Sequence, residues 1–81
     1  MCKTQWKLAQ NHYDMEIFLE DGMVRIKEWF DPGKNPNMHK FTFQEFLDGK
    51  FNYEIMMAFN GWIVTEIKEN IRKLLNKEEN N

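Results

Sequence analysis

Apolar and polar residues alternate on both sides of the dipeptide Asp21-Gly22. Asp-Gly favours a two-residue hairpin turn because both of its positions accept the positive φ that this turn requires. A turn at this place puts Leu19 opposite Val24, and the pairing continues outward from there. We therefore predict an antiparallel hairpin over residues 13–30, with its register set by the turn.

This register sorts the hairpin side chains into two faces, because successive residues of a strand point to opposite sides. One face is apolar apart from Glu28, and its other members are Tyr13, Met15, Ile17, Leu19, Val24, Ile26 and Phe30. The opposite face is polar with three large apolar side chains, and its members are Asp14, Glu16, Phe18, Glu20, Met23, Arg25, Lys27 and Trp29. Lys27 lies opposite Glu16 in this register, so we expect an ion pair there. Arg25 lies opposite Phe18, where we expect a cation–π contact.

The segment before the hairpin, residues 4–10, is expected to add another strand. With Asn11-His12 as its turn, Trp6 and Leu8 join the apolar face. A short helix over the same residues is the alternative, because His takes positive φ less readily than Gly does. The first part of the chain thus predicts a three-stranded antiparallel meander.

A loop rich in proline, glycine and asparagine follows, and beyond it the apolar residues take the period of a helix. Thr42 followed by Glu45 predicts a capping box and a short helix over residues 43–48. A fourth strand over residues 38–43 competes with this helix. The two elements coexist if the strand stops at Phe41.

Two more helices are predicted after residue 51. Asn52 is expected to cap a short helix over residues 53–60 that ends before Gly61 and turns inward Ile55, Met56 and Phe59. In the last segment apolar residues recur at spacings of three and four, at Ile63, Ile67, Ile71, Leu74 and Leu75. Such an amphipathic helix is stable only against another element, so we expect it to cover the apolar face of the sheet, with a flexible tail over residues 77–81.

The predicted fold class is therefore α+β, in a single domain over residues 1–81. Its parts are a three-stranded antiparallel β-meander, a C-terminal amphipathic helix packed against it, and one or two short helices between them. The sequence has one cysteine, Cys2, which cannot form an internal disulfide, so the cytoplasm is the expected compartment. No segment is long and apolar enough for a membrane span, so we expect no membrane association.

Candidate catalytic residues are few. The chain contains no serine, and its other candidate nucleophiles and bases are Cys2, His12 and His39. We interpret both histidines as ordinary surface residues, and no Cys or His pair has the spacing of metal ligands. Three carboxylates share the polar face with neutralising Lys7, Arg25 and Lys27, so we interpret them as a solvated charge ladder. We expect no enzymatic activity, no metal and no cofactor.

Exposed aromatic side chains beside arginine are typical of protein interfaces. The predicted partner-binding residues are Glu16, Phe18, Glu20, Met23, Arg25 and Trp29. The alternative is that a helix within residues 43–60 covers this face. We expect a non-enzymatic protein-binding module that acts by stoichiometric occlusion. By analogy of size alone it fits an inhibitor that a phage or mobile element directs against a bacterial defence complex, as anti-CRISPR proteins do.

Two other partners follow from the same pattern. A second copy of the chain is one, because a free sheet edge can pair across a two-fold axis. Nucleic acid is the other, through basic residues of the last helix, at Lys68, Arg72, Lys73 and Lys77. The carboxylates on the sheet and a net charge of −2 make nucleic acid the weaker hypothesis.

Overall fold

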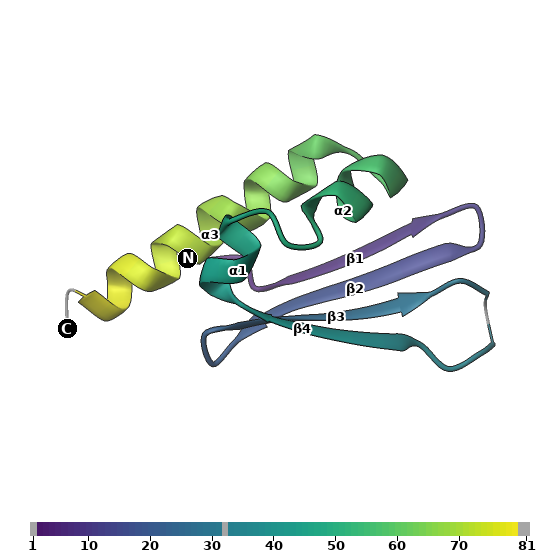
Figure 1. Cartoon of the computed structure of the whole chain (residues 1–81), viewed down its shortest axis with the longest axis horizontal. Helices are drawn as coiled ribbons and strands as arrows, with labels where there is room; N and C mark the ends of the chain where they lie inside the picture. The colour runs from purple at the N-terminus through teal and green to yellow at the C-terminus, as the bar shows by residue number, and fades with distance from the viewer. Residues whose placement is uncertain (1, 32, 80–81) are drawn as a thin grey trace.

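A four-stranded antiparallel sheet in the order β1-β2-β3-β4 carries three helices (Figure 1). The structure, a computed structural model, describes residues 2–31 and 33–79. In chain order the elements are β1 (Gln5–Gln10), β2 (Tyr13–Glu20), β3 (Met23–Trp29), β4 (Asn37–Thr42), α1 (Phe43–Leu47), α2 (Asn52–Ala58) and α3 (Gly61–Glu79). The α+β class, the antiparallel sheet and the C-terminal helix are confirmed. The prediction of three strands is wrong, because β4 adds a fourth.

Two tight turns fix the register of the first three strands. Asn11 and His12 have φ of 47° and 68°, and Asp21 and Gly22 have φ of 54° and 75°. Both turns therefore have the positive φ at both central positions that a twisted two-residue hairpin needs. β2 and β3 pair in the predicted register along all of β3, and β1 pairs with β2 as predicted. The strand interpretation of β1 is thus correct, and the alternative helix is not.

The strand β4 is the main departure from the predicted fold. It pairs antiparallel with β3 and places Phe41 opposite Val24, on the apolar face. It ends at Thr42, whose hydroxyl accepts a hydrogen bond from the Glu45 amide at 3.0 Å. The Thr42 amide in turn donates to Glu45 Oε1 at 2.8 Å, which completes the predicted capping box. Strand and helix therefore coexist, and they meet at Thr42 rather than at Phe41.

Two details of α2 differ from prediction. Phe51, in the left-handed region at φ 64°, occupies the N-cap position, and Asn52 is already helical. The Asn52 side chain instead donates to the Phe46 carbonyl at 3.0 Å, which fixes the connection between α1 and α2. Met56 is 46% exposed rather than inward, because α2 reaches the core through Ile55 and the next residue turns away.

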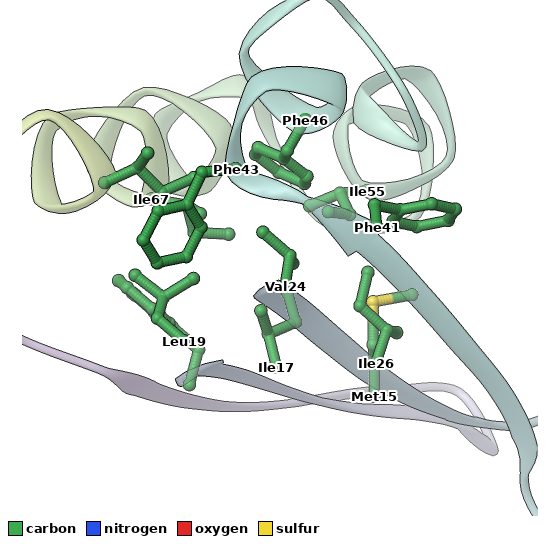
Figure 2. Close-up of a cluster of buried hydrophobic side chains, with 12 residues drawn as sticks. Met15, Ile17, Leu19, Val24, Ile26, Phe41, Phe43, Phe46, Ile55 and Ile67 are labelled. Carbon is green, nitrogen blue, oxygen red and sulfur yellow. The ribbon is translucent and has the colours of Figure 1, made fainter. Parts of the chain in front are cut away.

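All three helices lie on one face of the sheet, and the core is the layer between them (Figure 1). Figure 2 shows side chains from α1, α2 and α3 pointing toward the apolar side chains of β2 and β3. The buried apolar residues are Trp6, Met15, Ile17, Leu19, Val24, Ile26, Phe41, Phe43, Phe46, Ile55, Ile67 and Ile71. Residues 77–79 belong to α3, and residues 80 and 81 of the predicted tail lie outside the described residues. The C-terminal helix thus covers the face for which its apolar stripe was predicted.

Because the helices cover only one face of the sheet, truncation of two phenylalanines on opposite faces is expected to lower the free energy of unfolding by different amounts. Phe46 is fully buried, so Phe46→Ala is expected to lower the free energy of unfolding by about 3–5 kcal/mol. Phe18 lies on the face without helices, so Phe18→Ala is expected to cost about 1 kcal/mol or less. Urea unfolding followed by circular dichroism measures both values. Equal losses in the two variants would contradict this layering.

Candidate functional site

The sheet face that the helices leave uncovered is the candidate site, and we call it the outer face. The strand registers place on it Gln5, Lys7, Ala9, Asp14, Glu16, Phe18, Glu20, Met23, Arg25, Lys27, Trp29, Met38, Lys40 and Thr42. Each of these residues is exposed or half-buried, and none is buried. Because α1 and α2 pack on the opposite face (Figure 2), the alternative in which residues 43–60 cover this surface is wrong.

The outer face brings all six predicted partner-binding residues onto one surface. Phe18 and Arg25 are direct cross-strand partners, Glu20 and Met23 are another such pair, and Asp14 lies opposite Trp29. Strand β4 adds residues that the sequence analysis missed, because a three-stranded sheet has no place for them. They are Met38, Lys40 and Thr42. With Lys40 included, four basic side chains share the face with three carboxylates, so charges of both signs are interspersed on it.

Two predicted contacts on the outer face are not made as expected. Arg25 Nε lies 3.0 Å from Glu20 Oε1, so Arg25 forms an ion pair rather than resting over the Phe18 ring. Lys27 takes the position over that ring, with its Nζ 5.8 Å from the ring centroid. As a result no ion pair within the described residues joins Lys27 to Glu16, although the two are cross-strand partners. The predicted register of β2 and β3 is confirmed, but Arg25 and Lys27 contact diagonal rather than directly opposite residues of β2.

Two open hollows mark the outer face. The first has a volume of about 360 Å³, and the residues around it include Lys7, Ala9, Asp14, Glu16, Trp29 and Gly33. The second has a volume of about 320 Å³, and the residues around it are Phe18, Glu20, Arg25, Lys27 and Met38. Each combines an aromatic wall with charged groups of both signs. Aromatic rings beside charged groups are also what the anchor positions of protein interfaces contain.

A second polar cluster lies on the helix side of the sheet, and the sequence analysis missed it. Glu28 is only 7% exposed; its carboxylate accepts a hydrogen bond from the Tyr13 hydroxyl and lies 2.9 Å from His39 Nε2. The His39 ring packs against Phe51 with centroids 4.6 Å apart, so His39 is half-buried rather than an ordinary surface residue. Burial, the bond to Glu28 and the negative charges of Glu28 and Glu54 raise the pKa of Tyr13.

This cluster explains why a carboxylate interrupts the apolar face. A buried carboxylate is tolerated when its oxygens are paired, and Tyr13 and His39 supply the partners. β3 ends at Trp29, so Phe30 is not the strand partner of Tyr13, although their ring centroids lie 5.3 Å apart. Tyr13 and His39 thus supply the partners that the Glu28 carboxylate requires at one end of the core.

The basic residues of α3 do not form one surface. With about 100° of rotation per helical residue, Lys68 and Arg72 lie on one flank and Lys73 and Lys77 on the other. Glu69 lies between the two pairs on the exposed side. A single phosphate backbone would therefore meet an interrupted basic surface.

The chain matches no family model, no curated protein and no solved structure. Within the described part of the chain, no helix has the length and apolar character needed to cross a membrane. Among residues 2–31 and 33–79, no three His, Cys, Asp or Glu side chains are grouped as metal ligands would be. The geometry of the outer face is thus the main basis for a functional proposal.

The raised pKa of Tyr13 predicts a loss of stability in strong alkali. The unfolded chain releases the tyrosine proton near pH 10, whereas the folded chain keeps it. The contribution of Tyr13 to the free energy of unfolding is therefore fully present below that pH and is lost as pH rises above it. Tyr13→Phe removes this dependence, and it lowers stability near neutral pH because Glu28 loses a hydrogen bond.

Tyr53, which is 63% exposed, supplies the control. Tyr53→Phe is expected to keep the alkaline slope of the wild type. Urea unfolding at a series of pH values from 7 to 11 measures the three slopes. A Tyr13→Phe slope equal to that of the wild type would show that Tyr13 is not held protonated by the fold.

Proposed function

We propose that this chain is a small non-enzymatic protein-binding module whose outer face occupies a surface of its partner. The observation that carries the proposal is the one-sided cover of the sheet: all helices lie on one face and four large apolar side chains remain on the other. These side chains are Phe18, Met23, Trp29 and Met38. Large apolar side chains set among charged ones are the composition of an interaction site.

The energetics of the outer face favour a protein partner. Met38 is 65% exposed, and covering the exposed part of a side chain of this size contributes about 1–2 kcal/mol. Phe18 and Trp29, which are half-buried in the free chain, are partly held in place before binding, so a partner orders them at a low entropic cost. Interspersed Lys, Arg, Asp and Glu side chains then discriminate among partners and set the orientation.

Occlusion is the mode of action that fits this surface. The described hollows are open, and their aromatic and charged side chains lie at the surface, where a partner can cover them. A stoichiometric inhibitor works in this way, by covering a surface that its target needs. Inhibitors that phages or mobile elements direct against bacterial defence complexes are the form of this activity that the small size of the chain suggests.

Affinity capture tests the proposal. Wild-type protein, immobilised through its C-terminus, is expected to retain a partner protein that mass spectrometry identifies. Arg25→Glu and Trp29→Ala are each expected to reduce its retention at least tenfold, because they remove a central charge and an anchor ring. Both variants should keep a thermal melt, followed by circular dichroism, close to that of the wild type.

Arg72→Glu is the matched control, because Arg72 is an exposed arginine on α3. It should leave retention unchanged. Retention that survives both outer-face substitutions would overturn the proposal. Retention of nucleic acid that falls steeply with salt and is lost on charge reversal at Lys68, Arg72 and Lys73 would favour the alternative function.

A further inference from the structure

The strand β1 forms one edge of the sheet, and alternate backbone groups along it face away from β2. The Leu19 amide donates to the Thr4 carbonyl at 2.9 Å, so the residues of β1 that bond to β2 are the even-numbered ones. The N–H and C=O groups of Gln5, Lys7 and Ala9 therefore point outward. These three residues are exposed, and no other hydrogen bond of the described residues uses their backbone groups.

The opposite edge, β4, is less open. Its outward backbone groups belong to Met38, Lys40 and Thr42, but the Thr42 amide already donates to Glu45 Oε1 at 2.8 Å. The chain then turns directly into α1. The β1 edge thus offers the longer unpaired ladder, over a length of roughly 14 Å at 3.4 Å per residue.

The alignment of α3 with β1 places an exposed tryptophan of the helix. The Lys3 amide donates to Asn70 Oδ1 at 2.7 Å and Trp6 Nε1 donates to Glu66 Oε1 at 3.0 Å, so α3 runs antiparallel to β1 (Figure 1). Trp62 precedes Glu66 by one helical turn, on the same flank of α3 and about 6 Å further along it.

The apolar neighbour of Trp62 on the strand follows from the same alignment. Leu8 lies about 7 Å beyond Trp6 along β1, in the same direction, so Trp62 and Leu8 end up at the same level. Trp62 is 79% exposed and Leu8 is half-buried. By this alignment both apolar side chains lie on the helix side of the unpaired strand edge.

We propose that the β1 edge beneath Trp62 accepts an extended segment of another protein as a fifth strand. The unpaired backbone groups of Gln5, Lys7 and Ala9 specify an extended backbone as the occupant. On the helix side, an apolar side chain of this segment covers Leu8 and Trp62. On the other side, an acidic side chain meets Lys7, which is exposed and has no ion-pair partner among the described residues.

Charge favours an acidic segment over a second copy of the chain as the partner of the β1 edge. Pairing two β1 edges antiparallel about their centre would put Lys7 of one copy directly opposite Lys7 of the other, and like charges directly opposite one another destabilise a strand pair. An acidic segment has no such cost. This site goes beyond the outer-face proposal and does not rest on it, because its main feature is the unpaired backbone of β1, and of the side chains it uses only Lys7 also lies on the outer face.

A displayed library of random dodecapeptides, selected on the wild-type protein, tests the proposal. Enriched peptides are expected to alternate apolar and polar positions, with Asp or Glu among the polar ones. Addition of a synthetic enriched peptide to the ¹⁵N-labelled protein should shift the amide signals of Gln5, Lys7 and Ala9 and slow their hydrogen exchange. Lys7→Glu should weaken this peptide at least tenfold and should enrich Lys or Arg when the selection is repeated.

Lys7→Pro removes an outward amide and leaves the hydrogen bonds between β1 and β2 in place, and it should abolish peptide binding. Lys40→Pro is the control, because it makes the same change on the β4 edge, and it should leave peptide binding within twofold. Trp62→Ala should weaken binding about tenfold. Met38→Ala, on β4 at the opposite edge of the sheet, should leave it unchanged, which separates this site from the outer face.

Three results would overturn the proposal. One is the absence of enriched peptides, and another is enriched peptides whose binding survives Lys7→Glu and Trp62→Ala. The third is concentration-dependent dimerisation of the wild type that protects the β1 amides, since the occupant would then be a second copy.

Discussion

The fold depends on a steric constraint at two places, where pairs of consecutive residues have positive φ. Asn11-His12 and Asp21-Gly22 each allow two residues to reverse the chain, and this fixes which side chains of the adjoining strands are partners. A shift of one residue would move the apolar side chains of β2 to the outer face. The position of the core, the composition of the outer face and the direction of the unpaired groups on β1 all follow from these turns.

The sequence predicted the part of the fold that local rules decide. The Asp21-Gly22 turn and the period of two gave the register of β2 and β3, and the period of the last segment gave the face that α3 covers. β4 was ambiguous because Phe41 and Phe43 suit both a strand and a helix, and the chain uses one for each. The pairing of Glu28 with His39 could not be predicted, since it depends on the register of β4.

The candidate site was predicted to a similar extent and for similar reasons. The period of two predicts which side chains share a strand face, such as Phe18 and Trp29. All six predicted partner-binding residues lie on the face on which the predicted register placed them. The choice of partner among flexible charged groups does not follow from register, which is why Lys27 rather than Arg25 lies over Phe18. The level of Trp62 along β1 depends on how α3 docks on that strand, which the Trp6–Glu66 hydrogen bond shows, and no pattern within either segment carries that information. A sheet with cover on one side thus leaves exposed the outer face and the β1 edge, the two surfaces for which we propose partners.

The central claim is that the helices cover one face of this sheet and leave the other bare. Nuclear Overhauser effects between side chains measure it most directly. The account predicts cross-peaks from the methyl groups of Ile17 and Val24 to the ring of Phe46, and none from the rings of Phe18 or Trp29 to α1, α2 or α3. Cross-peaks between Trp29 and a helix, with none from Val24 to Phe46, would contradict it.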